Sequence, residues 1–192
     1  MTEDPFVPSQ NQNLPVQPSS QRCSSENNIS AVQPPMKRIL DCITEPSQLS
    51  CLTNDELNIL AHELREEIIS VTAKTGGHVA SSLGAIEIIV AVHSLINSPT
   101  DKFVFDVGHQ AYAHKLLTGR LKNFPTLRSF GGISGFTNPA ESKHDVHAAG
   151  HASDSLSIAL GLAKARAIRG SNEKIVALIG DAGISGLSLI HI

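Results

Sequence analysis

The sequence predicts an α/β protein in which a parallel sheet is flanked by helices. Residues 102–105 and 174–179 are short apolar runs typical of strands, and they alternate with segments that show helical spacing of apolar residues. Aromatic residues make up only 4% of the 192 residues and Trp is absent, so the core must be built from aliphatic side chains. Such a core suits helices that pack on a parallel sheet.

Composition divides the chain near residue 35. Seven of the 10 Pro lie in the first 50 residues, whereas all 14 Gly lie at or after Gly76. Residues 1–35 are rich in Pro, Gln and Ser and poor in large apolar residues, so we predict a disordered tail there. Residues 36–192 are predicted to form the folded domain, with order beginning near Ile39.

Charge and hydropathy argue against several classes of partner. The net charge is −3 and no long basic run occurs, so we expect no nucleic-acid or anionic membrane partner. No stretch approaches the roughly 20 apolar residues that a membrane helix needs. The amino terminus lacks an apolar signal-peptide core and is poor in Arg, so the expected location is cytoplasmic.

Three segments are predicted to be helical. Thr53 with Glu56 three residues later forms a capping-box pattern, which should start a helix that runs to about Ala73. A second helix is expected from about residue 82 to the turn at residues 97–99, and its apolar residues on most sides predict burial on two faces. A third should span residues 155–169 and stop at the following glycine.

The remaining segments are predicted to be short elements and loops. The run at 174–179 is expected to be a buried strand. A short helix should follow residue 109, with Gly119 as its C-cap. Residues 121–150 contain several Gly and Pro residues and are expected to be loop-rich.

Acidic residues and glycines follow the two predicted strands, at residues 106–109 and 180–183. Ligands of open parallel sheets bind beyond the carboxyl ends of the strands, so these turns are candidate site segments. A third turn, residues 149–152, precedes the third helix, whose N-terminus would favour a phosphate. Asp181 could hold Mg²⁺ together with a diphosphate, or it could simply cap its own turn.

Histidines concentrate in the middle of the chain, since seven of nine lie between His78 and His151. Histidine donates hydrogen bonds to phosphate and exchanges protons near neutral pH. A zinc site is the competing interpretation, but no nearby Cys and no convincing helical His pair support it. The residue pattern by itself therefore indicates an anion and metal site on a parallel α/β domain.

Four motifs follow one another along the chain. Residues 76–84 read GGHVASSLG, residues 106–112 read DVGHQAY, residues 150–153 read GHAS, and residues 180–181 read GD. Together they resemble the motifs of the 1-deoxy-D-xylulose-5-phosphate synthase family. Transketolase and related enzymes share the last motif, whereas the second is typical of the synthases. The resemblance covers roughly residues 40–187.

The resemblance implies a thiamine-diphosphate-binding domain of the transketolase diphosphate type. Family members condense pyruvate with glyceraldehyde 3-phosphate, release CO2 and form a precursor of isoprenoids, thiamine and pyridoxal. The implied cofactors are thiamine diphosphate and Mg²⁺, and the full-length enzymes are homodimers.

Site residues also follow from the resemblance. His78 corresponds to the catalytic histidine and Asp181 to the metal ligand. The implied contacts of thiamine diphosphate are His109, Gly150, His151, Ala152, Ala182 and Gly183. Ala152 stands where the family usually has a small hydroxyl residue, and Ala182 where it often has Gly.

The family places a metal-binding Asn about 30 residues after the Asp, and the pyrimidine-binding domain follows later. We therefore expect residues 36–192 to be a partial domain, incomplete at its C-terminus, and we expect the fragment alone to be inactive. Two alternatives stay open. The chain could be the diphosphate-binding subunit of another transketolase-type enzyme, or a non-catalytic domain that binds anions or a partner.

Overall fold

A computed structural model describes residues 37–185 of the chain. The predicted disordered tail, residues 1–35, lies outside the described residues. The helices and strands run in the order α1 Asn54–Thr75, α2 Val79–Gly84, α3 Ile86–Leu95, β1 Lys102–Phe105, α4 Tyr112–Lys115, α5 Ser155–Arg169 and β2 Ile175–Leu178. Short helical turns accompany them at Leu40–Cys42, Pro46–Cys51, Leu116–Arg120, Leu121–Thr126 and Asp181–Ser185.

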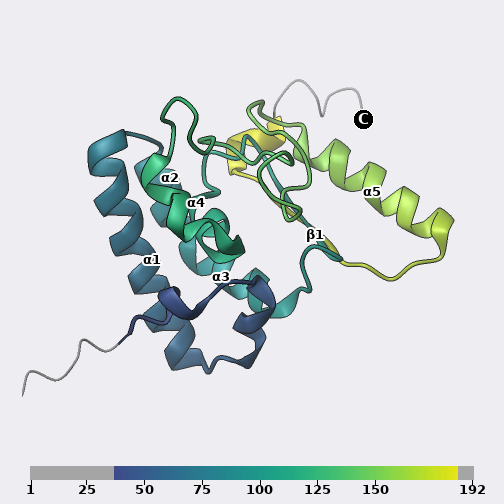
Figure 1. Ribbon diagram of the computed structural model, residues 1–192. Helices are drawn as coiled ribbons and strands as arrows, with labels where there is room; N and C mark the ends of the chain where they lie inside the picture. Colours follow the sequence, from purple (N-terminus) through teal and green to yellow (C-terminus); the bar gives the residue numbers. More distant parts are fainter. Residues whose placement is uncertain (1–36, 186–192) are drawn as a thin grey trace, which may run out of the picture. The chain divides into compact units, whose positions relative to one another are not determined.

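The two strands form a parallel sheet, as the alternation of strands and helices predicted. Lys102 pairs with Ile175 and Phe105 with Leu178, so the carboxyl ends of both strands lie at the same edge. Figure 1 shows α1 to α4 gathered on one side of the strands and α5 on the other. A parallel pair needs a long crossover, and the loop-rich segment with α5 supplies it.

Helix α1 begins and packs as its sequence predicts. Thr53 accepts a hydrogen bond from the backbone of Glu56, and the Glu56 side chain bonds back to the Thr53 backbone, which completes the capping box. The stripe that follows is buried at Leu60, Leu64 and Ile68. These aliphatic side chains join those of α3, α4 and β1 in one core.

The second predicted helix is two helices, which corrects the expectation of one helix from about residue 82 to the turn at residues 97–99. α2 ends at Gly84, and α3 begins after Ala85, whose φ and ψ of −103° and −3° interrupt the helical path. Glycine in a helix costs about 1 kcal/mol relative to alanine, which weakens the helix at this point. Buried Ser82 also donates to the His109 carbonyl oxygen, which ties α2 to the turn after β1.

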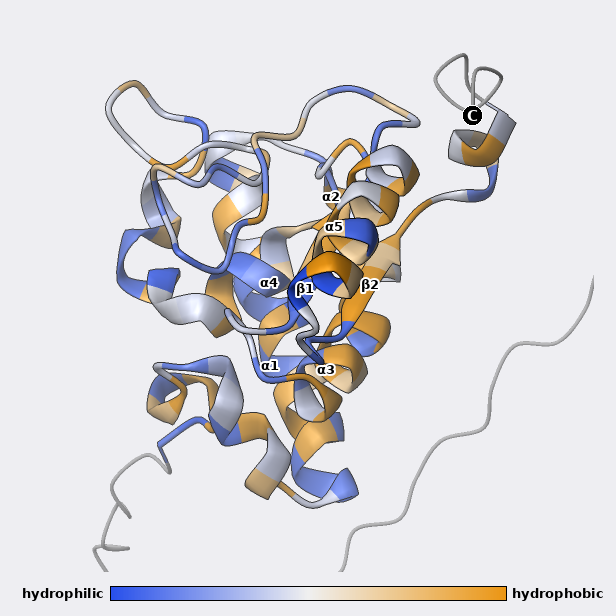
Figure 2. Cartoon of the chain, turned by 90° about the vertical axis from the view of Figure 1, so that its right-hand side faces the viewer, coloured by the Kyte–Doolittle hydropathy of each residue, from blue (hydrophilic) through white to orange (hydrophobic). Residues whose placement is uncertain are grey.

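Burial of α3 and β2 is less complete than the sequence predicts. α3 buries Ile86 and Ile89 but leaves Ile88 and Leu95 exposed, so only one of its two apolar faces is covered within the described residues. All four residues of β2 are half-buried, because in residues 37–185 it pairs only with β1 and its second edge has no strand beside it. In Figure 2, residues of high hydropathy gather along α3, α5 and β2.

The other elements follow their sequence signals. α5 ends at Gly170, which adopts the left-handed conformation with φ of 67°, and Gly119 has φ of 83° where the short helical region after residue 112 ends. Residues 127–154 contain no helix or strand, as the loop-rich composition predicts. Between residues 37 and 185 no helix is both long enough and apolar enough to cross a membrane.

A buried polar chain anchors the loop at residues 127–154 to the helices. The His93 Nε2 lies 2.9 Å from the His114 Nδ1, and the His114 Nε2 lies 2.9 Å from the Asp145 Oδ1. Arg120 completes the chain by donating two hydrogen bonds to the Asp145 carboxylate. Because the carboxylate accepts from the His114 Nε2–H, the His114 Nδ1 must accept from His93.

The buried hydrogen bonds of His93 and His114 predict that the folded protein loses stability in mild acid. Burial lowers the pKa of both His93 and His114, so the folded state binds fewer protons than the unfolded state, whose histidines titrate near pH 6.5. The stabilisation is therefore complete above about pH 6.5 and is lost as the pH falls towards the lowered pKa values. Urea unfolding between neutral and acidic pH measures this slope.

The variant His93→Gln tests the cause of the slope. Its amide N–H can replace the His93 Nε2 donor but cannot titrate, so the pH dependence should become shallower. The exposed His62 provides the matched control, because His62→Gln removes a histidine from the surface of α1. Equal slopes in the wild type and His93→Gln would contradict the prediction.

Candidate functional site

Two turns at the carboxyl edge of the sheet enclose a cavity of about 320 Å³. One turn follows β1 and the other follows β2, so the parallel pairing brings them together although they are more than 70 residues apart in the chain. The lining residues are Asp106, Val107, His109, Ala152, Gly180, Asp181, Ala182 and Gly183. This is the edge of the sheet at which parallel α/β proteins bind ligands.

The turn after β1 is held in a strained conformation. Val107 has φ of 60°, which is rare for a β-branched residue, and its N–H donates to the His151 carbonyl oxygen at 3.2 Å. Gly108 follows with φ of 78°, and a side chain there would lie 2.7 Å from the Ala149 Cβ. Backbone strain of this kind is concentrated at functional sites. The hydrogen bond of Val107 and the close approach of Gly108 hold this turn against residues 149–151.

Asp106 connects this turn to α5. It is 3% exposed, and its Oδ1 accepts from the backbone N–H of Ser155, the first residue of α5. The N-terminus of α5, expected from the sequence to favour a phosphate, is thus already in contact with a carboxylate of the chain. A phosphate bound at the 149–152 turn would share this helix end with Asp106.

The turn after β2 approaches Asp106 closely. A Cβ added to Gly183 would lie 2.7 Å from the Asp106 Oδ2 and 2.8 Å from the Ile179 Cγ1, so only glycine fits there without a shift of its neighbours. The Ser153 hydroxyl donates to the Gly183 carbonyl oxygen at 2.7 Å, and the Asp181 Oδ1 accepts from Ala182 N–H. Asp181 itself is exposed at the mouth of the cavity.

His78 and His109 lie beside each other near the cavity. Their ring centroids are 5.5 Å apart in an edge-to-face arrangement, and Phe136 packs against His78. The His78 N–H donates to the Tyr112 hydroxyl at 3.2 Å, which fixes the backbone of the glycine turn before α2. Burial, followed by the neighbouring His78, lowers the pKa of His109, so its imidazole is neutral at physiological pH.

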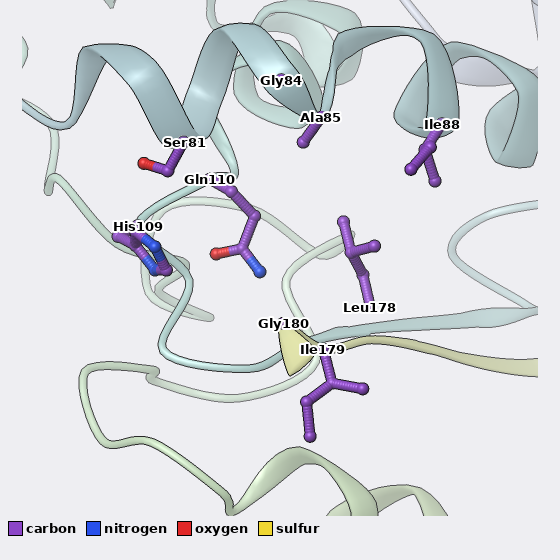
Figure 3. A pocket seen from close by; sticks show the side chains of 9 residues that line it. All are labelled: Ser81, Gly84, Ala85, Ile88, His109, Gln110, Leu178, Ile179 and Gly180. Carbon is purple, nitrogen blue, oxygen red and sulfur yellow. The ribbon is translucent and has the colours of Figure 1, made fainter. Parts of the chain in front are cut away.

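A second cavity, of about 200 Å³, lies between α2, α3 and the end of β2. Figure 3 shows the Gln110 side chain between His109 and Leu178, with the helix residues Ser81 and Ala85 above it. Gln110 donates to the Asp106 carbonyl oxygen, while its buried Oε1 has no donor among the described residues. His109 borders both cavities.

The structure gathers the residues that the sequence selected into one region. The cavity is lined by five of them, His109, Ala152, Asp181, Ala182 and Gly183. Of the other three, His78 reaches the region through its ring contact with His109 and His151 through its backbone bond to Val107. Gly150 precedes His151 with φ of 145° and does not line the cavity.

Three lining residues, Asp106, Val107 and Gly180, were not among the individual site residues selected from the sequence, although all three lie in the turns that it singled out. An acid directly after a strand is the signal that selected Asp181, and Asp106 carries the same signal after β1. Val107 gives no such signal, because a valine in sequence does not reveal a positive φ.

The residues that line the cavity suit a hard cation only when a bound ligand supplies the remaining oxygen atoms. In residues 37–185 no three His, Cys, Asp or Glu side chains are grouped so as to hold a metal ion by themselves. Carboxylate oxygens from Asp106 and Asp181 border the cavity, and Mg²⁺ usually takes one or two carboxylates and fills its remaining positions with phosphate oxygens and water. The donor set therefore suits a metal–diphosphate complex.

Comparison with known proteins gives a consistent result. Residues 40–189 match the family model described as 1-deoxy-D-xylulose-5-phosphate synthase. The chain is 59% identical over 151 residues to 1-deoxy-D-xylulose-5-phosphate synthase 2 of Geobacter sulfurreducens, which covers 79% of this chain and 24% of that protein. It is 55% identical over 148 residues to the synthase of Thermus thermophilus, covering 77% of this chain and 24% of the relative. The chain thus spans about a quarter of the length of the curated relatives it matches.

Proposed function

Since this chain belongs to the 1-deoxy-D-xylulose-5-phosphate synthase family, we propose that it is the part of such an enzyme that binds the diphosphate end of thiamine diphosphate. The complete protein would condense pyruvate with glyceraldehyde 3-phosphate, release CO2 and act as a homodimer. The observation that carries the proposal is the cavity where the turns after β1 and β2 meet, which collects five of the eight expected site residues.

In this proposal, Asp181 holds Mg²⁺ at the mouth of the cavity. The backbone of Ala182 and Gly183 borders the diphosphate, since both residues line the cavity. Neutral His109 donates one hydrogen bond to a phosphate oxygen, and residues 150–152 border the same ligand. Each role agrees with a side chain or backbone group in or beside the cavity.

Thiamine diphosphate would supply the carbanion chemistry, so the residues of this chain would orient the cofactor and transfer protons. His78 lies in ring contact with His109, and its backbone is held by Tyr112. We assign to His78 the transfer of a proton to or from the substrate, because histidine is the side chain that gains and loses a proton near neutral pH.

Calorimetric titration of the purified chain tests the cofactor site. Thiamine diphosphate with Mg²⁺ should bind, whereas thiamine without its diphosphate should bind at least about tenfold more weakly, because the expected contacts are to the diphosphate. A folded chain that binds neither compound would refute the proposed site. Equal affinity for the two compounds would show that the diphosphate is not what the chain recognises.

A further inference from the structure

Two glycines join α1 to α2, and His78 directly follows them. Gly76 and Gly77 have φ of 71° and 145°, conformations that glycine adopts at no steric cost and also leaves easily. α2 spans only Val79–Gly84, and no side chain caps its N-terminus at His78. In the part of the chain that the structure describes, the Tyr112 hydroxyl is the group that accepts the His78 N–H.

The ring of Tyr112 is fixed in the core, so its hydroxyl is a firm support for this connection. The side chain is fully buried and packs edge to face on Phe124, with 6.0 Å between the ring centroids. The hydroxyl oxygen lies 3.2 Å from the His78 backbone nitrogen, and a Cβ added to Gly77 would lie 2.7 Å from it. The hydroxyl therefore both bonds the glycine turn and limits the space that the turn can occupy.

The turn after β1 thus places two histidines. It carries His109 directly, and Tyr112, three residues later at the start of α4, holds His78. The two imidazole rings meet edge to face, and Phe136 packs on His78 with 5.7 Å between centroids. A second bond between the same segments, from the Ser82 hydroxyl to the His109 carbonyl oxygen, lies farther along α2 and does not engage the His78 N–H.

We propose that Tyr112 is a positioning residue for His78, and that its hydroxyl keeps the imidazole of His78 beside that of His109. The inference rests on the proposed function, which assigns proton transfer to His78. Proton transfer needs hydrogen-bond reach, and a displacement of about 1 Å can cost about a hundredfold in rate. Tyr112 is fully buried and acts through His78, from a position 34 residues away in the chain.

The variant Tyr112→Phe tests this role in the purified 192-residue chain without cofactor, because it removes the hydroxyl and keeps the packed ring. Proton nuclear Overhauser effects between aromatic rings report that the rings lie close together. In the wild type, these effects should join His78 to His109 and to Phe136. In Tyr112→Phe both effects should be lost, because the backbone of His78 is no longer held.

The matched control is Thr72→Val, which removes a different buried hydroxyl from the same core. The Thr72 hydroxyl donates to the Ile68 carbonyl oxygen within α1 and has no bond to α2 or to the turn after β1. The control should lower the melting temperature and keep both Overhauser effects. A loss of stability is thereby separated from a loss of position.

Two results would overturn the inference. If folded Tyr112→Phe melts at a lower temperature but keeps both Overhauser effects, the hydroxyl only stabilises the fold. If the wild type itself lacks the effects, the rings of His78 and His109 are not held together. Because no cofactor is needed, the test is separate from that of the proposed function: the expected effects in a chain that binds no thiamine diphosphate would support the positioning of His78 and refute the proposed function.

Amide hydrogen exchange of the wild type decides the question if Tyr112→Phe does not fold. After correction for sequence effects, the His78 N–H should exchange at least about fivefold more slowly than the Val79 N–H, because the first residue of a helix has no intrahelical acceptor. Equal exchange of the two amides would show that the bond to the Tyr112 hydroxyl is not kept in solution, and the positioning role would then be wrong.

Discussion

Replacing Asp181 with asparagine is expected to weaken Mg²⁺-dependent binding of thiamine diphosphate at least about a hundredfold. Changes around metal ligands typically cost up to that factor, and removal of the ligand charge itself should cost no less. Asparagine can still accept the Ala182 N–H bond that Asp181 accepts at 2.9 Å, so the turn should keep its conformation. Calorimetry with thiamine diphosphate and Mg²⁺ measures the change.

The replacement of Asp181 should change binding and leave folding intact. Asp181 is exposed in the structure, so its replacement should leave the melting temperature close to that of the wild type. Undiminished Mg²⁺-dependent binding by folded Asp181→Asn would rule out Asp181 as the metal ligand and leave its capping role as the remaining interpretation.

Replacing Asp145 with alanine is expected to destabilise the fold by about 3–5 kcal/mol, the usual cost of removing one partner from a buried ion pair. Asp145 accepts hydrogen bonds from His114, Arg120 and the Asn138 backbone, and its side chain is fully buried. Burial alone would raise its pKa, but the bonds from His114 and Arg120 outweigh burial and hold the pKa well below its usual range. Within residues 37–185, removal leaves the buried Arg120 with Glu141, at 3.5 Å, as its one acidic partner.

Urea unfolding of Asp145→Ala measures this loss, and Asp41→Ala is the matched control. Asp41 pairs with Arg38 at the surface, where an ion pair contributes about 0–1 kcal/mol. Because Asp145 also holds the loop at Asn138, the variant should show faster proteolysis within residues 127–154. A destabilisation as small as that of Asp41→Ala would show that the buried hydrogen bonds of Asp145 contribute little to the stability of the fold.

Elements with a local signal were predictable from the sequence. The capping box at Thr53 and Glu56 starts α1, and Gly170 ends α5 in the left-handed conformation. β1 has the bounds that its apolar run indicated. These signals act through neighbours in the chain, so residue order alone contains them.

Tertiary contacts decided the features in which the structure differs from the sequence-based predictions. The separation of α2 from α3 depends partly on Ser82 bonding to His109, 27 residues away. Likewise, β2 is half-buried because the described residues cover only part of it, although its apolar sequence is that of a central strand. Apolar composition indicates what a strand can bury, whereas the neighbouring elements determine what it does bury.

The candidate site also combines features that the sequence predicts with features that only the fold shows. Acids and glycines directly after strands are local signals, and they singled out the two turns from the sequence. The resemblance to the synthase family then selected His109 and the metal-ligand role of Asp181 within them. Only the fold places Asp106 between α5 and Gly183, since those contacts join segments 49 residues apart and farther. The family of the chain was therefore readable from its residues, whereas the meeting of the two turns in one cavity was decided by tertiary structure.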